Sequence, residues 1–428
     1  MIQVNLLRQH RTDYRTRLAK RGWTEAQLQL LDDALAHDDA RKAHQTGMDA
    51  ALAEQKQLSA QIGALMKSGR REAAAAIKTR VAESKTRSQA LKEQWQAASD
   101  ELEAILLQIP NIPHESVPAG TSEADNEVYQ DWPEPLPTLA GTAQPHWELA
   151  KTYRLFDLEL GVKLTGSGFP VYRGQGARLE RALINFFLDE ATAAGYEEVM
   201  PPLLVNADSA RATGQLPDKE GQMYHATEDD FYLIPTAEVP LTNIYRNDIV
   251  AAEDLPLKLC GHTPCFRREA GSYGKDVRGL NRVHQFNKVE IVQIAHPDKS
   301  YAVLDEMLDH VKGLLEKLEL PYRILRLCGG DLGFTSALTY DFEVYSAAQR
   351  RWLEVSSVSN FETYQTNRLK LRYREGKTKA LAHSLNGSAL ALARIVAALL
   401  ENNQTADGIL LPDVLHPYTG FERIGPRD

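Results

Sequence analysis

The chain has 428 residues, of which 43% are hydrophobic and 25% are charged, and its formal net charge at pH 7 is −9. This length predicts two or three domains, and the composition is that of a globular protein. No apolar run reaches the ~18 residues of a membrane span, and MIQVNLLRQHRTDYR lacks the apolar core of a signal peptide, so we expect no membrane association. The odd, small number of cysteines (Cys260, Cys265 and Cys328) fits a reducing, cytoplasmic compartment, and we expect buried free thiols rather than a zinc site.

The first hundred residues are predicted to be helical. Residues 1 to about 24 form a short helical start that ends at Arg21-Gly22-Trp23. Thr24 then has the character of an N-cap, with Gln27 in the capping-box position. From there to Leu107 the chain is poor in proline and rich in good helix formers, which predicts long helices.

Within this stretch, core positions recur in alternating steps of three and four residues. One set comprises Met48, Leu52, Gln55, Ser59, Ile62 and Met66. A second set comprises Ile77, Val81, Ser84, Ser88, Leu91, Trp95, Ala98, Leu102 and Ile105. Ser68-Gly69 separates the two sets and can reverse the chain. The spacing predicts an antiparallel two-helix coiled coil, on the order of 50–60 Å long.

Positive charge gathers around the predicted turn of this hairpin. The basic residues there are Lys67, Arg70, Arg71, Lys78, Arg80, Lys85 and Arg87, against only Glu72 and Glu83. A hairpin of this kind can be a dimerisation coil or a solvated spacer, and a basic one can also bind nucleic-acid phosphates. The charge pattern alone leaves these alternatives open.

Three prolines, Pro110, Pro113 and Pro118, mark the end of the hairpin, and the acidic, proline-rich stretch 111–139 is typical of a linker laid over a surface. We therefore expect an arm over residues 1–108, a linker and entry segment over 109–165, and a main domain over 166–428. The main domain starts with an amphipathic helix over Arg178–Ala193 and a strand that ends at Pro201-Pro202.

The rest of the main domain alternates short β-rich segments with two long helical ones. The strands are expected at Phe231–Ile234, Thr263–Arg268, Phe286–Ile294, Asp341–Tyr345 and Trp352–Ser359, and the helices at Asp298–Leu318 and Ser388–Asn402. This order predicts an α+β fold with a central antiparallel sheet flanked by helices. Neither GxGxxG nor GxxxxGK[ST] occurs, so a Rossmann or P-loop nucleotide site is not expected.

The segment TPCFRREAGSYGKDVRGLNRVHQFNKVE, which begins at Thr263, is the most informative part of the chain. It has the pattern of a strand, a glycine-rich basic loop and a second strand, in which alternation puts Phe286, Lys288 and Glu290 on one face. Arg267 can clamp a phosphate, and Glu269 and the aromatic ring of Phe286 suit a nucleotide base. An ordinary exposed Arg/Glu pair on a hairpin is the alternative.

This segment resembles the second signature motif of class II aminoacyl-tRNA synthetases, in the form found in seryl-tRNA synthetases. LIPTAEVPL, from Leu233, resembles the serine-binding segment of that family, and NGSALALARIVAALLENNQ, from Asn386, resembles its third motif. The helix-strand-proline unit before Pro202 resembles the first motif, which forms the dimer interface in the family. The resemblance implies a cytoplasmic homodimer whose coiled-coil arm binds tRNA-Ser, and also tRNA-Sec where that tRNA exists.

The resemblance also implies the reaction and the nucleotide site. L-Serine would be activated by ATP with Mg²⁺ and then transferred to tRNA. Arg267, Glu269 and Arg394 would act in catalysis, and Glu354 and Ser357 would hold the metal. The residues implied in ATP binding are Arg267, Arg268, Glu269, Arg278, Val283, Phe286, Glu354, Val355, Ser356, Ser357 and Arg394. Those implied in serine binding are Thr236, Ala237, Glu238, Arg267, Glu290 and Ser388, with Glu290 suited to both the ammonium and the hydroxyl of the substrate.

Several residues depart from the family pattern without removing a charged group of this site. Arg268, Ala389 and Ala393 replace smaller residues, and Ser384 and Val358 stand where threonine and cysteine are frequent. Three rival interpretations remain from the sequence. They are a class II enzyme for proline or threonine, an enzyme that loads carrier proteins, and a catalytically inactive paralogue that acts as an RNA-binding module.

Overall fold

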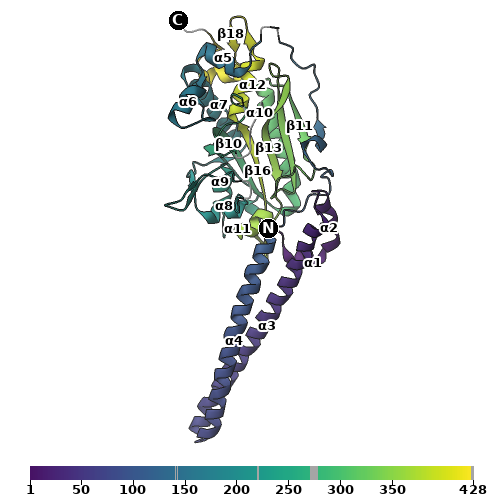
Figure 1. Cartoon of the computed structure of the whole chain (residues 1–428), viewed down its shortest axis with the longest axis vertical. Helices are drawn as coiled ribbons and strands as arrows, with labels where there is room; N and C mark the ends of the chain where they lie inside the picture. The colour runs from purple at the N-terminus through teal and green to yellow at the C-terminus, as the bar shows by residue number, and fades with distance from the viewer. Residues whose placement is uncertain (140, 142, 219–220, 270–277, 426–428) are drawn as a thin grey trace. The chain divides into compact units, whose positions relative to one another are not determined.

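A computed structural model describes residues 1–428 except 140, 142, 219–220, 270–277 and 426–428 (Figure 1). The chain divides into two compact units. The first comprises Met1–Ala19 and Trp23–Pro110, and the second comprises Lys20–Gly22 and Asn111–Asp428. The stretch 111–165, which we expected to be a linker and entry segment, thus belongs to the second unit. No helix in the described part of the chain is long and apolar enough to cross a membrane.

The first unit is entirely helical and is dominated by a hairpin of two long helices (Figure 1). Its helices are α1 (Val4–Gln9), α2 (Arg11–Ala19), α3 (Glu25–Lys67) and α4 (Arg71–Leu106). The predicted capping box is confirmed, since the Thr24 side chain accepts from the Gln27 backbone and the Gln27 side chain accepts from the Thr24 backbone. The turn at Ser68-Gly69 is also confirmed, and Gly69 takes the left-handed φ of 75° that ends α3 without a Cβ clash.

The seam between α3 and α4 was predicted correctly for α4 and one residue out of register for α3. Ser84, Ser88, Ala98 and Leu102 of α4 are buried as expected. In α3, however, Ala51 and Leu58 are buried, whereas Leu52 is 46% and Met66 is 49% exposed. The two helices approach closely through small residues, and the Ser84 hydroxyl donates to the Ala51 carbonyl oxygen at 2.8 Å. Only a short side chain at position 51 permits this approach, so the larger Leu52 lies outside the seam.

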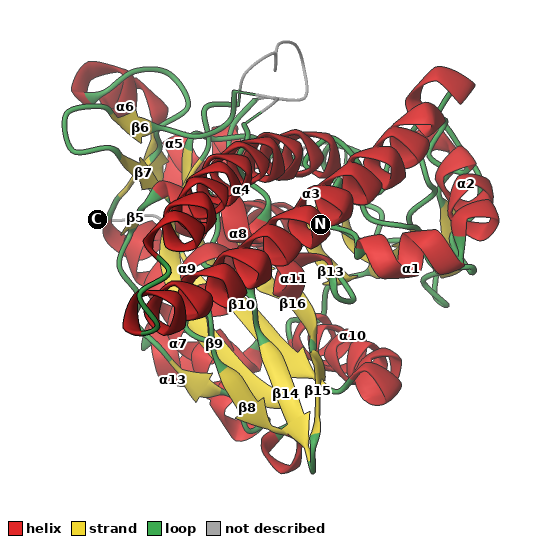
Figure 2. Ribbon diagram, turned by 90° about the horizontal axis from the view of Figure 1, so that it is seen from below, coloured by secondary structure: helices red, strands yellow, loops and turns green. Residues whose placement is uncertain are grey.

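The second unit is built on an eight-stranded sheet (Figure 2). In sheet order its strands are β1 (Glu127–Gln130), β11 (Tyr322–Arg326), β12 (Leu338–Ser346), β13 (Arg351–Asn360), β16 (His383–Ala391), β10 (Gln285–Ala295), β9 (Leu257–Phe266) and β4 (Glu197–Glu198). All neighbours pair antiparallel except β4 and β9, which are parallel. The central sheet is therefore antiparallel, as expected, except at the β4 edge, which makes it mixed.

Nine helices are described in the second unit. They are α5 (His146–Tyr153), α6 (Leu158–Leu164), α7 (Gly174–Ala193), α8 (Ala207–Thr213), α9 (Glu238–Asn243), α10 (Ser300–Lys317), α11 (Tyr364–Leu369), α12 (Leu392–Asn402) and α13 (His416–Thr419). Of these, α7, α10 and α12 supply apolar side chains to one large core that covers one face of the sheet. The expected helix over Ser388–Asn402 begins only at Leu392, because Ser388 and Ala391 still pair with Glu290 and Lys288 of β10, as part of strand β16.

Short sheets complete the unit. One pairs β2 (Phe156–Asp157) with β3 (Val171–Tyr172), and in another β7 (Phe231–Leu233) lies between β5 (Leu204–Val205) and β6 (His225–Ala226). In a third, β14 (Arg372–Glu375) lies between β8 (Ile249–Ala251) and β15 (Thr378–Leu381). In the last, β18 (Gly408–Leu410) lies between β17 (Gln404–Thr405) and β19 (Arg423–Ile424). The three cysteines are buried free thiols, as expected.

Candidate active site

A polar cavity of about 1020 Å³ lies over the face of the large sheet that the core helices do not cover. The alternation of side chains along the strands explains both faces. In β10, Phe286, Lys288 and Glu290 line the cavity, while Val289 and Ile291 enter the core. The same division holds along β12 and β16, whereas along β13 the consecutive residues from Glu354 to Ser357 all line the cavity. Four neighbouring strands therefore turn polar side chains toward one cavity. The expected shared face of Phe286, Lys288 and Glu290 is confirmed.

One end of the cavity holds a compact group of buried polar side chains. Lys288 donates to the Thr236 hydroxyl at 2.9 Å and forms an ion pair with Glu290. The Thr236 hydroxyl in turn donates to Glu290 Oε2 at 3.1 Å. The side chains of Lys288 and Glu290 are only 7% and 3% exposed, so this ion pair is screened little by solvent. Ser388 lies opposite Glu290 on the neighbouring strand and also lines the cavity.

A second carboxylate, Glu238, lies at the same end at the start of α9. Burial and the negative charge of Glu290 raise the pKa of Glu238 to about 7. Gln365 donates to Glu238 Oε1 at 2.6 Å, and Ser384 donates to Gln365 Oε1 at 2.8 Å. Ser384, one of the departures noted in the sequence, thus contributes a donor to the support of Glu238.

Beside this group, the cavity wall combines a cationic and an aromatic side chain. The Arg267 guanidinium lies 5.3 Å from the centre of the Phe286 ring, which orients it by a cation–π contact. Arg267 also donates to the Pro235 carbonyl oxygen at 3.4 Å. Glu269 lines the cavity and forms an ion pair with Arg282. Its φ of 50° shows that the extended strand has ended before this residue, although Glu269 still lines the cavity together with Arg267.

Arg394 enters the cavity from the first turn of α12. Its Nε donates to the Asn281 carbonyl oxygen at 2.9 Å, and its Nη1 donates to the Glu354 carbonyl oxygen at 2.6 Å. The guanidinium is 3.7 Å from Glu354 Oε2. Two backbone acceptors on different segments therefore fix the plane of this guanidinium, and Arg394 lines the cavity. Val283, Val355 and Ser356 line the cavity as well.

Two oxygen ligands suited to a hard cation lie near Arg394. The Ser357 hydroxyl is 3.4 Å from Glu354 Oε1 and donates to Asp341 Oδ1 at 2.6 Å. Burial, and then the charge of Glu354, raises the pKa of Asp341 well above its ordinary value. The Glu354 side chain is 49% exposed, so it is accessible from the cavity. A carboxylate and a hydroxyl are ligands that Mg²⁺ accepts, and the pair therefore fits this ion.

Three residues named from the sequence do not line the cavity. Ala237 is fully buried beneath it. Arg268 is exposed, and its backbone N–H donates to Gln222. The Arg278 guanidinium lies 4.7 Å from the centre of the Trp147 ring and 3.4 Å from Glu148. Residues 270–277, which include most of the basic loop in the second motif, lie outside the described residues.

The sequence did not assign roles to three residues that complete the site. Lys288 was placed on the correct face, and its position between Phe286 and Glu290 was a usable signal. Asn386 lines the cavity from β16, a strand that was not predicted. Asp341 supports Ser357 across the β12–β13 pair, and its only sequence signal was its place in a predicted strand.

Comparison with known proteins gives matches over both units. Residues 222–403 match the tRNA synthetase class II core domain (G, H, P, S and T), and residues 1–113 match the Seryl-tRNA synthetase N-terminal domain. The serine–tRNA ligase of Salinibacter ruber is 55% identical over 400 residues, which cover 92% of this chain and 93% of that protein. The serine–tRNA ligase of Geobacter sulfurreducens is 45% identical over 433 residues, with coverage of 99% and 100%.

A solved structure agrees over the full length. The seryl-tRNA synthetase from Pyrococcus horikoshii, crystallised in complex with ATP, is 31% identical, with a TM-score of 0.93 and coverage of 100% of both chains.

The mixed sheet, its polar cavity and the match over residues 222–403 define a class II aminoacyl-tRNA synthetase core. The N-terminal match and the level of identity narrow this class, and the chain belongs to the seryl-tRNA synthetase family, whose curated members are serine–tRNA ligases. The resemblance inferred from the sequence is confirmed, as is the order of a helical arm followed by a class II core. The proline- and threonine-activating alternatives are thereby excluded.

Proposed function

We propose that the cavity of the second unit forms seryl-adenylate from L-serine and ATP and then transfers serine to tRNA-Ser. The observation that carries this proposal is the pairing, in one cavity, of a buried Lys288–Glu290–Thr236 group with an Arg267–Phe286 stack. The first group suits a small zwitterion with a hydroxyl, and the second suits a nucleotide. Attack of a carboxylate on an α-phosphate brings two anions together, and cationic groups that neutralise both are the main requirement.

At the amino-acid end, Glu290 accepts from the ammonium and the hydroxyl of serine, while Thr236, Glu238 and Ser388 complete the pocket. A buried carboxylate left without its partner disfavours alanine, which lacks the hydroxyl. Lys288 pairs with Glu290 in the described structure, so serine has to share this carboxylate with the lysine. We infer that Lys288 keeps Glu290 correctly oriented before serine enters.

At the nucleotide end, Arg267 bridges the serine carboxylate and the α-phosphate, Glu269 accepts from the adenine amino group, and Phe286 stacks on the base. Arg394 covers the other face of the base and reaches the γ-phosphate. Glu354 and Ser357 would hold Mg²⁺, which neutralises phosphate charge when it is bound. We also propose that Arg268 and Arg278, which adjoin the second-motif loop, bind ATP, with Arg278 at the triphosphate tail.

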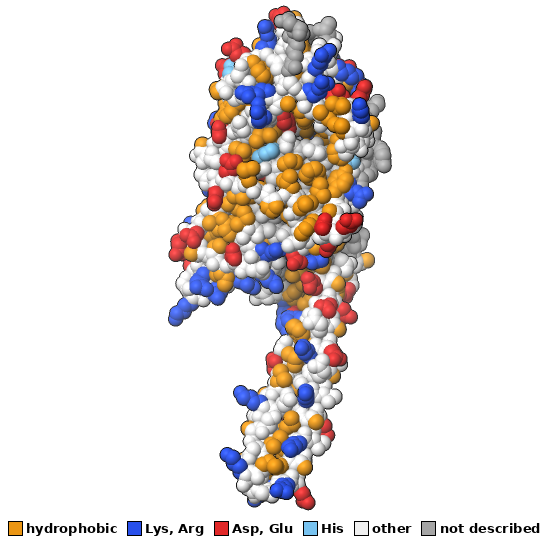
Figure 3. Space-filling model, turned by 90° about the vertical axis from the view of Figure 1, so that its left-hand side faces the viewer, with side chains coloured by type: hydrophobic (Ala, Val, Ile, Leu, Met, Phe, Trp, Pro, Cys, Tyr) orange, Lys and Arg blue, Asp and Glu red, His pale blue; other side chains and the backbone are white. Residues whose placement is uncertain are grey.

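The first unit is proposed to bind tRNA. Basic side chains stand out along the lower part of the hairpin in Figure 3, and Lys78, Arg80, Lys85 and Arg87 of α4 lie outside the buried seam. Contacts of this kind go to phosphates and depend on the shape of the RNA rather than on its base sequence. The same contacts would admit tRNA-Sec as well as tRNA-Ser.

We propose that the enzyme is a cytoplasmic homodimer. Met200, which follows β4, is 90% exposed, and Val162 and Leu164 are 57% and 67% exposed. Figure 3 shows hydrophobic side chains gathered on one face of the second unit, and such patches commonly mark interfaces. Three free cysteines agree with a reducing compartment. Light scattering after size exclusion tests the dimer, and a monomer at micromolar concentration would contradict it.

The direct test is ATP–pyrophosphate exchange with each of the twenty amino acids, with Mg²⁺ and without tRNA. Exchange with serine alone is expected. Exchange with a different amino acid would overturn the pocket assignment, and no exchange at all would favour the inactive RNA-binding paralogue. Deletion of residues 45–96 should leave serine-dependent exchange intact and abolish tRNA charging. Normal charging by the truncated protein would overturn the role of the arm. Transfer of serine to a carrier protein would favour the alternative of an enzyme that loads carrier proteins.

A further inference from the structure

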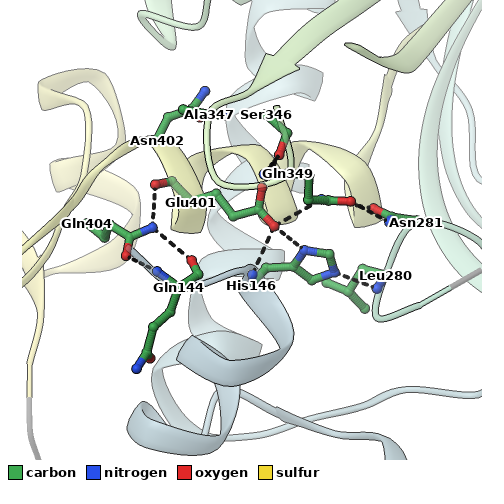
Figure 4. A network of polar contacts seen from close by, with 10 residues as sticks. All are labelled: Gln144, His146, Leu280, Asn281, Ser346, Ala347, Gln349, Glu401, Asn402 and Gln404. Carbon is green, nitrogen blue, oxygen red and sulfur yellow. Dashed lines mark hydrogen bonds and ion pairs between the residues drawn. The ribbon is translucent and has the colours of Figure 1, made fainter. Parts of the chain in front are cut away.

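A buried polar network is centred on His146 and Glu401, and it has no role in the reaction described above (Figure 4). Both side chains are completely buried, and neither lines the cavity. His146 is the first residue of α5, and Glu401 lies in the last turn of α12. Residues 255 positions apart therefore form a buried acid–imidazole pair, which is costly unless it is fully hydrogen-bonded.

The contacts of the pair indicate which imidazole nitrogen carries the hydrogen. The Leu280 backbone N–H donates to His146 Nε2 at 2.8 Å, so this nitrogen carries a lone pair. The proton is then on Nδ1, which donates to Glu401 Oε1 at 2.6 Å. Ser346 donates to Glu401 Oε2, and the Gln349 amide donates to Glu401 Oε1 at 3.0 Å. Both carboxylate oxygens of Glu401 therefore accept hydrogen bonds, and the lone pair of His146 Nε2 accepts from the Leu280 N–H.

The segment that His146 holds forms part of the wall of the cavity. Leu280 and Asn281 both line it, directly after the basic loop of the second motif. Gly279 has a φ of 71°, and a Cβ there would lie 2.1 Å from His146 Nε2, so only glycine lets the backbone approach the ring this closely. A second connection runs from the Asn281 amide, which donates to Gln349 Oε1 at 2.8 Å.

The network reaches the nucleotide site through Arg394. The Asn281 carbonyl oxygen accepts from Arg394 Nε at 2.9 Å, so the backbone that His146 fixes also sets the plane of this guanidinium. Arg394 and Glu401 lie seven residues apart on α12, which places them on the same side of the helix two turns apart. The helix is thus fixed at one end by the buried pair and presents its arginine to the cavity at the other.

We propose that His146 and Glu401 are positioning residues for ATP. They hold the Leu280–Asn281 backbone and, through it, Arg394 in the orientation that the nucleotide requires. The inference rests on the proposed ATP role of Arg394. It predicts that breaking the contact from Leu280 weakens the use of ATP and leaves the serine end, on β10 and α9, unchanged.

Two substitutions of the same residue separate positioning from packing. In His146→Asn the amide overlays Nδ1 and still donates to Glu401, but it does not reach the Leu280 N–H. In His146→Gln the amide oxygen reaches the position of Nε2 and can still accept from Leu280. Loss of one buried hydrogen bond of about 1–1.5 kcal/mol corresponds to about a 5–10-fold change. We therefore expect a KM for ATP about 5–10-fold higher in His146→Asn than in His146→Gln, with the KM for serine within about twofold in both.

The route through Arg394 is tested with a double-mutant cycle. Arg394→Ala should raise the KM for ATP by itself, and adding His146→Asn should then have little further effect. Fully additive effects, or equal rises in KM for ATP and serine, would overturn the positioning role. If Arg394→Ala left the KM for ATP unchanged, the assigned nucleotide site would fail instead, which distinguishes the two failures. If His146→Asn does not fold, Gln349→Leu takes its place, because it removes the side chain that connects Asn281 with Glu401. This variant must show the same rise in the KM for ATP without a rise in the KM for serine, or the inference is wrong.

Discussion

Glu180 of α7 should make the stability of the second unit depend on pH. Its carboxyl is buried, and Asn287 Nδ2 donates to Glu180 Oε1 at 3.1 Å. Burial raises the pKa of Glu180 from its ordinary value of 4.5 to about 7, although the contact from Asn287 acts in the opposite direction. The folded protein therefore favours the neutral acid, whereas the unfolded chain ionises it at lower pH.

The sign of the effect follows from this difference. Below pH 4.5 the group is neutral in both states and has no effect on the free energy of unfolding. As the pH rises from 4.5 to about 7, the unfolded chain loses its proton first, so the folded state becomes progressively less stable. A rise of this size is equivalent to about 3 kcal/mol, and the full loss is present above pH 7.

Substitution Glu180→Gln removes this titration while keeping an oxygen that accepts from Asn287. The free energy of unfolding of the variant, relative to the wild type, should increase by about 2–3 kcal/mol between pH 5 and pH 8. Denaturant unfolding followed by tryptophan fluorescence at pH 5, 6, 7 and 8 measures it. The matched control is Glu159→Gln on the exposed surface of α6, which should show no trend. A difference that is constant, or that grows as the pH falls, would refute the buried neutral acid.

Three further changes test separate parts of the structure. Arg21 donates to four backbone carbonyls of the second unit at 2.6–3.1 Å. Denaturant unfolding of Arg21→Ala should therefore give a free energy of unfolding about 3 kcal/mol or more below that of the wild type, and Arg21→Lys should restore only part of this loss. If both variants were as stable as the wild type, the structural role of Arg21 would be contradicted. Leu58→Ala should speed proteolytic cleavage of the arm in the full chain, because truncation of a buried leucine costs about 2–5 kcal/mol of stability. The control is Leu52→Ala, which changes an exposed leucine and should not speed cleavage. Faster cleavage of Leu52→Ala than of Leu58→Ala would support the register first expected. Arg267→Ala should abolish serine-dependent pyrophosphate exchange but leave tRNA binding in a filter assay, and surviving exchange would disprove its role.

Strand alternation made part of the site predictable. Phe286, Lys288 and Glu290 share the cavity because a pleated strand sends every second side chain to the same face, which the sequence displays directly. The strand β16 was missed for the opposite reason. Its end, around Ala389, is rich in alanine and leucine, which favour a helix locally, but pairing with β10 overrides that preference. The helix can begin only at Leu392, where the pairing with β10 has ended.

The coiled coil shows how side-chain size can mislead a correct period. Both Leu52 and Ala51 fit a three-four alternation in α3, and the larger residue is the natural choice for a core. The hairpin instead packs closely enough for the Ser84 hydroxyl to reach the Ala51 carbonyl, so the small residue occupies the seam. The distance between the helices decides the register, and that distance depends on both helices together.

The support of the nucleotide site could not be inferred from local sequence. Arg394 can be recognised from the sequence because a guanidinium at the start of a helix suits a phosphate. Glu401 lies seven residues further along the same helix and therefore on the same face as Arg394. His146 has no such signal, because a histidine at the start of a short helix is unremarkable until a carboxylate 255 residues away meets it in the core. The substrate-facing groups are thus conspicuous one by one, whereas the residues that orient them become meaningful only as a connected set. A search for positioning residues should therefore begin at the backbone carbonyl that accepts from Arg394 and proceed outward through its partners.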